Sequence, residues 1–88
     1  FDPEAMPNIE KRFGNRLNYS ESMYAALENA DALLICTEWS IFRTPNFSKL
    51  NQLLNQPIIF DGRNLYNVNE IESEGFTYIS IGRKATNL

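Results

Sequence analysis

Two short, uninterrupted apolar runs constrain the fold of this chain more than any other feature. The first covers residues 32–36, and the second covers residues 57–60 and leads directly into Asp61-Gly62. Apolar runs of this length with helical segments around them are typical of strands that are buried on both faces of a parallel sheet. The two runs therefore predict two strands of a parallel sheet that is covered on both sides.

Helical periodicity and capping residues fill the stretches between and around these runs. Apolar residues at 47, 50, 53 and 54 follow the helical period after the N-cap Asn46, and this helix must end before Pro57. Three further helical segments have a cap or a closing glycine: residues 8–13 before Gly14, a helix from Ser20 to about residue 29, and a turn from Asn67 through residue 71 that closes at Gly75.

A third strand completes the predicted sheet. Residues 76–81 alternate between apolar and polar side chains, whereas residues 17–19 suit either a very short strand or an extended link. Residues 83–88 read as a frayed tail. Strands separated by helical stretches predict an α/β sandwich with a mostly parallel sheet, and a chain of 88 residues forms a single domain, 1–88.

Composition excludes several classes of function. A net charge of −3 and a pI near 4.8 argue against a nucleic-acid partner, which usually requires a basic face. The absence of His removes the usual general base and the commonest metal ligand, and one Cys forms neither an internal disulfide nor a thiolate zinc site. No apolar run approaches the length of a membrane span, so we expect no membrane association and a reducing, cytoplasmic location.

Ligands of open parallel sheets bind beyond the carboxyl ends of the strands, and two such ends carry polar residues here. Thr37-Glu38-Trp39 follows the first run, and Asp61-Gly62-Arg63-Asn64 follows the second. Gly62 permits a sharp turn that approaches a ligand, and Arg63 presents a planar fork of donors that suits a phosphate. The alternative is structural: Asp61 caps the next segment and Arg63 forms a surface ion pair. The residues alone leave both open.

Other candidate residues favour structural roles. Thr37 suits the N-cap of a helix over residues 39–43. Trp39 and Phe42 suit either the core beneath the end of the sheet or contact with a ligand, and the core is favoured. Cys36 ends an apolar strand without a basic neighbour, which indicates an inert buried thiol. The three carboxylates at 70, 72 and 74 suit a solvated face, and the chain lacks a Gly-rich phosphate loop.

Four motifs in order resemble a known family. They are Phe-Asp-Pro at residues 1–3, Ala-Asp-Ala-Leu-x-Ile-x-Thr-Glu-Trp-x-x-Phe at 30–42, Ile-Phe-Asp-Gly-Arg-Asn at 59–64 and Gly-Phe-x-Tyr-x-Ser-Ile-Gly-Arg at 75–83. The chain thereby resembles the C-terminal, UDP-binding domain of the UDP-glucose 6-dehydrogenase family. Thr-Glu-Trp favours the UDP-glucose branch over relatives that act on UDP-N-acetyl amino sugars or GDP-mannose.

The resemblance implies an oxidoreductase. Family members oxidise UDP-glucose to UDP-glucuronate in two NAD-dependent steps. Their N-terminal Rossmann domain carries NAD, a central helical region carries the catalytic Cys and forms the dimer, and the C-terminal domain covers UDP. The Cys-Phe-Pro-Lys-Asp motif, the NAD glycine fingerprint and the catalytic Lys and Asn are not in this sequence. The chain is therefore expected to hold no catalytic residue and to be inactive alone, with UDP-glucose, the other domains and a homo-oligomer as its partners.

The resemblance also implies which residues form the site, and it changes the fold that we expect. The Arg of Asp-Gly-Arg belongs to the family's UDP-sugar site and corresponds to Arg63, while Thr37, Glu38 and Asn64 are expected to shape the same pocket. The family's domain opens with a strand and a helix before its Asp-Pro turn. The expected fold is therefore a three-layer Rossmann-like sandwich that lacks its first strand and helix here.

One alternative comes from another class of function. A stand-alone α/β binding or regulatory module, of the receiver or flavodoxin-like type, shares such a sheet but uses different sites. A receiver needs an acidic cluster and a Lys after successive strands, which this chain does not offer.

Overall fold

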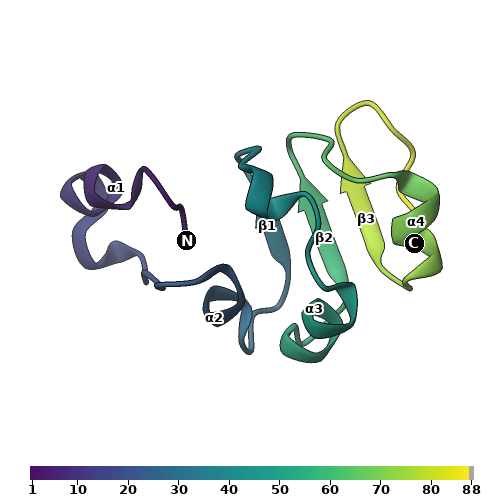
Figure 1. Cartoon of the computed structure of the whole chain (residues 1–88), viewed down its shortest axis with the longest axis horizontal. Coiled ribbons are helices and arrows are strands. Elements are labelled where there is room, and N and C mark those ends of the chain that lie inside the picture. Colours follow the sequence, from purple (N-terminus) through teal and green to yellow (C-terminus); the bar gives the residue numbers. More distant parts are fainter. Residues whose placement is uncertain (88) are drawn as a thin grey trace.

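A parallel three-stranded sheet organises the chain. The structure is a computed structural model that describes residues 1–87. Strands β1 (Leu33–Ile35), β2 (Ile58–Asp61) and β3 (Thr77–Ser80) lie side by side in that order, and all of them are parallel (Figure 1). The parallel sheet, with a helix between successive strands, confirms the α/β, Rossmann-like class.

Three helices join and cover these strands. They are α2 (Met23–Leu27), α3 (Phe47–Leu53) and α4 (Val68–Ser73). The side chains of Asn46 and Asn67 accept the predicted N-cap hydrogen bonds from the backbone N–H groups of Lys49 and Glu70. The prediction of Ser20 as a cap is wrong, because the Ser22 side chain caps α2 instead. Within the described residues, no helix has the length and apolar character of a bilayer span.

The helices cover one face of the sheet and form a core with it. Alternate strand residues point to this face. The Phe47 ring of α3 packs edge to face against the rings of Tyr66 and Phe76. Among residues 1–87, the core consists of nine buried side chains: Leu27, Ile35, Leu50, Leu54, Ile59, Tyr66, Ile71, Phe76 and Tyr78.

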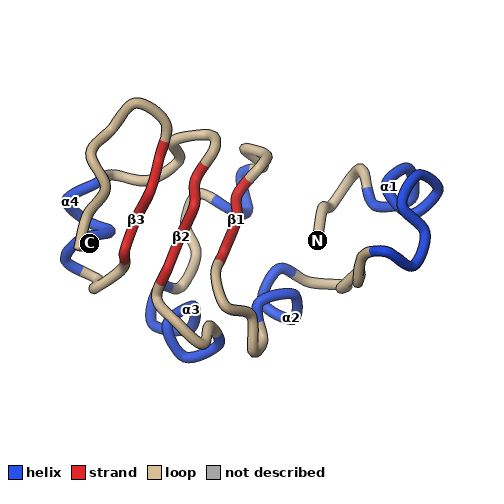
Figure 2. Tube along the Cα trace, turned by 180° about the vertical axis from the view of Figure 1, so that it is seen from behind, coloured by secondary structure: helices blue, strands red, loops and turns tan. Residues whose placement is uncertain are grey.

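The opposite face of the sheet is open. Leu34 of β1 is paired with Phe60 of β2, and these side chains are 67% and 40% exposed. Ile81, just beyond β3, is 66% exposed. Seen from behind, no helix crosses in front of the strands (Figure 2). The prediction that the strands are buried on both faces is therefore wrong, and residues 1–87 form two of the three expected layers.

Residues 1–22, which we call the N-terminal arm, lie apart from the sheet (Figure 1). Helix α1 (Met6–Phe13) has Pro7 in its first turn and ends at Gly14, whose N–H donates to the carbonyl of Glu10, so the predicted helix is confirmed with an earlier start. A 3₁₀ turn, η1 (Gly14–Arg16), follows, and residues 17–19 form an extended link rather than a strand. A groove of about 520 Å³ with a mostly apolar lining separates the arm from β1.

The end of the chain folds back on β3. Thr86 is 7% exposed, forms an antiparallel bridge with Tyr78, and donates its hydroxyl to the carbonyl of Phe76 at 3.1 Å. Asn87 donates to the same carbonyl at 3.0 Å. The prediction of a frayed tail is therefore wrong for residues 83–87, and residue 88 lies outside the described part.

Candidate functional site

The carboxyl ends of β1 and β2 bring two of the predicted site residues together. Glu38 lies in the loop after β1, Arg63 lies in the turn after β2, and Arg63 Nη2 donates to Glu38 Oε1 at 2.8 Å. Both side chains are about half exposed, at 48% for Arg63 and 52% for Glu38. The two loops therefore meet as predicted, and the Arg63 guanidinium is paired with the Glu38 carboxylate in this structure.

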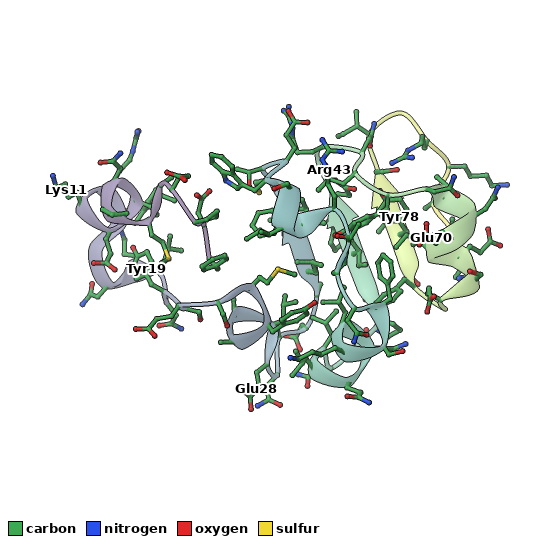
Figure 3. The ribbon with its side chains drawn as sticks, viewed as in Figure 1. Lys11, Tyr19, Glu28, Arg43, Glu70 and Tyr78 are labelled. Atoms are coloured by element: carbon green, nitrogen blue, oxygen red, sulfur yellow. The ribbon has the colours of Figure 1, made fainter. Side chains whose placement is uncertain are left out.

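A second arginine joins this pair. Arg43 Nη2 lies 3.5 Å from Glu38 Oε2, and Arg43 is labelled at the carboxyl end of the strands in Figure 3. Two guanidinium groups thus share one carboxylate, which leaves one formal positive charge. We call Glu38, Arg43 and Arg63 the arginine cluster. Its excess positive charge and its exposure suit an anionic ligand.

The turn that carries Arg63 lies against the end of β1. The Gly62 N–H donates to the Ile35 carbonyl at 2.9 Å, and a Cβ atom on Gly62 would lie 3.1 Å from that same oxygen. Such a distance is tighter than most Cβ contacts. A side chain at position 62 would therefore crowd the end of β1. The close approach that the sequence predicts for Gly62 is made to the backbone of β1 within this chain.

Asp61 closes this turn from inside the protein. Its side chain is 2% exposed. Its Oδ1 accepts the Arg63 N–H at 2.9 Å, and its Oδ2 accepts the Leu65 N–H at 2.7 Å and the Tyr78 hydroxyl at 2.6 Å. The predicted cap is present. Burial, and then the hydrogen bond to Asp61, raises the pKa of Tyr78 to about 12, so its hydroxyl stays protonated and donates at neutral pH.

Asn64 links the turn to the loop after β3. Its backbone φ is +55°, a left-handed conformation that Asn tolerates better than most residues. Its Nδ2 donates to the Ile81 carbonyl at 3.0 Å, and its Oδ1 accepts the Ile81 N–H at 2.9 Å. Because both ends of the amide bond the backbone, the side chain fixes the position of the turn.

Thr37 lines a different part of the surface from the arginine cluster. It is half-buried and lines the apolar groove beside β1. It caps no helix, because the 3₁₀ turn η2 (Ser40–Phe42) begins after Trp39. Trp39 is 39% exposed, and its Nε1 donates to Asp2 Oδ2 at 3.3 Å. The prediction that Trp39 belongs to the core is therefore wrong, because this side chain lies over the arm.

Cys36 is exposed, which contradicts the prediction of a buried thiol. The reason is the alternation of the strand: Ile35 points to the core, so Leu34 and Cys36 point to the open face. The acidic residues 70, 72 and 74 are all exposed, in agreement with a solvated face. Among residues 1–87, no group of three His, Cys, Asp or Glu side chains is placed to hold a metal ion.

The described residues do not fit NAD. Its pyrophosphate usually lies against closely spaced glycines between a strand and a helix. The four glycines of this chain, at positions 14, 62, 75 and 82, are widely separated, and the turn after β2 lies against the Ile35 carbonyl.

Two arginines in or near the site were missed by the sequence analysis. Arg43 was seen only as the end of a predicted helix, and Arg83 only as part of the tail. Arg83 donates to the Ser80 hydroxyl, the Tyr66 carbonyl and the Tyr78 hydroxyl at 2.9–3.0 Å. The Ser-Ile-Gly-Arg ending of the last motif was the available signal for Arg83, whereas neither spacing nor periodicity pointed to Arg43.

Two comparisons relate this chain to known proteins. A family model described as "UDP-glucose/GDP-mannose dehydrogenase family, UDP binding domain" matches residues 1–68. UDP-glucose 6-dehydrogenase TuaD of Bacillus subtilis is 41% identical over 97% of this chain and 18% of that protein. UDP-glucose 6-dehydrogenases of Rickettsia bellii and Pseudomonas aeruginosa are 40% and 41% identical, over 96% and 93% of this chain and 20% and 19% of those proteins.

The chain thus spans about a fifth of the length of the curated relatives that it matches. The family model covers most of the 88 residues, including β1, β2 and the arginine cluster. The resemblance noted in the sequence is confirmed: this chain belongs to the UDP-glucose/GDP-mannose dehydrogenase family, within its UDP binding domain.

Proposed function

We propose that this chain is the UDP-sugar-binding domain of an NAD-dependent UDP-glucose 6-dehydrogenase, which oxidises UDP-glucose to UDP-glucuronate. Family membership and relatives named UDP-glucose 6-dehydrogenase support the activity. NAD, held by another domain, would supply the hydride acceptor. The residues of this chain bind and orient the UDP moiety, and the catalytic Cys belongs to another region. A stand-alone receiver-like module is not favoured by these matches.

Arg63 is the residue that we assign to the diphosphate. The observation that supports it most is its position: a half-exposed guanidinium at the carboxyl edge of a parallel sheet, on a turn held by a buried carboxylate. Arg43 adds a second positive charge beside it. A diphosphate replaces the Glu38 carboxylate as the anionic partner, or shares the two guanidinium groups with it. Hydrogen bonds to charged groups contribute about 1.5–3 kcal/mol.

The other three candidate residues have supporting roles in this proposal. Glu38 holds Arg63 toward the carboxyl edge in the absence of ligand. Asn64 fixes the Arg63 turn against the loop after β3 through its two bonds to Ile81. Thr37 precedes Glu38 in the loop after β1 and lines the groove, so we assign it a part in shaping the pocket beside the cluster.

Further protein surrounds this chain in the proposed enzyme. The other domains of the enzyme supply the remaining walls of the UDP-glucose cleft, and the enzyme is a cytoplasmic homo-oligomer. The open face of the sheet, with Leu34, Phe60 and Ile81, supports contact with further protein, because apolar patches of this kind commonly mark interfaces.

Steady-state kinetics of the enzyme that carries this chain test the site. Arg63→Ala should raise the KM for UDP-glucose about 10- to 100-fold and leave the KM for NAD nearly unchanged. Arg63→Lys should recover part of the loss, because an ammonium group lacks the bidentate fork. Arg12→Ala removes an exposed arginine from the arm and serves as the matched control. Unchanged UDP-glucose kinetics in Arg63→Ala would refute the assignment.

A further inference from the structure

A buried carboxylate lies directly behind the proposed UDP-binding arginine. Asp61 is among the most buried side chains of the protein, at 2% exposure, and accepts three hydrogen bonds. A buried carboxylate requires partners of this kind, since burial without them is costly. Two of the three donors are backbone N–H groups of the turn, those of Arg63 and Leu65. Asp61 thus fixes the backbone of Arg63 and of the residue two positions beyond it.

The third donor, the Tyr78 hydroxyl, connects Asp61 to further hydrogen-bonding groups on and after β3. The Tyr78 hydroxyl donates to Asp61 and accepts hydrogen bonds from Arg83 Nη2 at 3.0 Å and from the Tyr66 N–H at 3.4 Å. Arg83 in turn donates to the Tyr66 carbonyl and the Ser80 hydroxyl. The hydroxyl of Tyr78 therefore uses its proton and both lone pairs. Hydrogen bonds thus link the Asp61 carboxylate to the Tyr78 phenol, and the phenol to the Arg83 guanidinium. This series of groups joins the end of β2 to β3 and the loop after it.

We propose that Asp61 is a positioning residue for Arg63, and that Tyr78 and Arg83 hold the Asp61 carboxylate in the required orientation. The inference rests on the proposed role of Arg63 in UDP binding. A guanidinium lies at the end of a long, flexible side chain, so its direction depends on the backbone angles at its own Cα. Bonds from Asp61 on both sides of Arg63 restrict those angles and pre-organise the turn, which lowers the entropy lost on binding.

Asp61→Asn tests the inference in the enzyme that carries this chain. An Asn side chain has one acceptor oxygen for the three donors that Asp61 serves, so the turn loses part of its support. The KM for UDP-glucose should rise about tenfold while the KM for NAD stays unchanged. In an Arg63→Ala background, Asp61→Asn should raise the KM little further, because its effect acts through Arg63.

The outcomes separate the two proposals. If Arg63→Ala alone leaves UDP-glucose kinetics unchanged, the proposed UDP site fails. A second outcome is that Arg63→Ala raises the KM for UDP-glucose whereas Asp61→Asn leaves it unchanged. A third is that Asp61→Asn raises this KM equally with Arg63 and with Ala at position 63. In either case the positioning role of Asp61 fails and the proposed UDP site stands. Ile71→Val is the control for lost stability. Ile71 is fully buried on α4 and its side chain makes no hydrogen bond to the turn, so its variant should melt earlier with an unchanged KM for UDP-glucose.

Tyr78→Phe provides the same test where Asp61→Asn yields no folded enzyme. This variant keeps the ring in the core and removes the hydroxyl, while both backbone bonds of Asp61 remain. The KM for UDP-glucose should rise about threefold with Arg63 present and stay level in Arg63→Ala. An equal rise with and without Arg63 would overturn the inference.

Discussion

The N-terminal arm (residues 1–22) and the rest of the described chain, the sheet unit (residues 23–87), have similar local signals but different packing. Helix α1 has a proline in its first turn and a closing glycine, and α3 has an Asn cap. Among residues 1–22, all of which the structure describes, none is buried. The sheet unit holds the whole buried core, including the fully buried Leu50 of α3.

This difference shows that caps and turns define where a helix begins and ends, whereas burial depends on a partner in three dimensions. The arm has apolar side chains on α1 and beyond, with Phe13 at 39% and Leu17 at 46% exposure. Met6, Ile9 and Leu17 line a groove instead of a packed layer. Most of the folding free energy should therefore come from the sheet unit, since isolated short helices are marginal in water.

The largest expected effect compares two phenylalanines. Phe76→Ala removes a fully buried ring from the sheet unit and should cost about 3–5 kcal/mol of unfolding free energy. Phe13→Ala removes an exposed ring from the arm and should cost at most about 0.5 kcal/mol. Urea unfolding followed by circular dichroism measures both. Similar losses in the two variants would mean that the arm packs as well as the sheet unit.

A second prediction concerns alkaline pH. The pKa of Tyr78 is raised by burial to about 12 from an ordinary value of 10, so the folded protein binds this proton more tightly than the unfolded chain does. The resulting stability is complete below pH 10 and is lost as pH rises to 12, by about 1–2 kcal/mol. Tyr78→Phe should flatten this decline in urea unfolding at several pH values. Burial also raises the pKa of Tyr66, so some decline should remain. An identical pH dependence in both proteins would contradict the assignment.

A third prediction concerns the open face of the sheet unit. Its apolar side chains and the unpaired edge of β1 should cause the 88-residue chain to self-associate at high concentration. Leu34→Lys places a charge on this face, at the β1 edge of the sheet, and should shift the chain toward monomer, with little loss of stability. Sedimentation velocity over a wide concentration range measures this. Monomeric wild type at every concentration would show that the open face does not drive association.

The smallest effect is expected at Cys36. Because this thiol is exposed on the open face, it should react with a thiol reagent at a similar rate in the native and the unfolded chain. Cys36→Ala should change the unfolding free energy by about 0.5 kcal/mol or less, as for other exposed positions. A native rate that is many-fold slower than the unfolded rate would restore the buried thiol that the sequence suggested.

The sequence predicted well what depends on neighbours along the chain. The Asn46 and Asn67 caps, the Gly14 end of α1 and the three strands are set by local conformation and periodicity, and the structure contains all of them. The meeting of Glu38 and Arg63 was also predictable. Their loops follow parallel strands, and parallel strands place their carboxyl ends at one edge.

The features that the sequence missed depend on what covers each surface. Leu34 and Cys36 belong to a continuous apolar run, which looks the same whether one face of the strand is covered or both. The ordered tail depends on Thr86 bonding the carbonyl of Phe76, a contact between residues with no local pattern. Arg43 joins the cluster only because the 3₁₀ turn after Trp39 returns it to Glu38.

The most direct test of the proposed UDP site is hydrogen exchange of the proposed enzyme that carries this chain, with and without UDP. The central claim is that UDP binds at the carboxyl edge of the sheet unit through the Arg63 turn, and not at the arm. Added UDP should slow the exchange of amides in residues 62–65 about tenfold or more and leave those of α1 unchanged. Slower exchange in α1 with no change in residues 62–65 would contradict the claim.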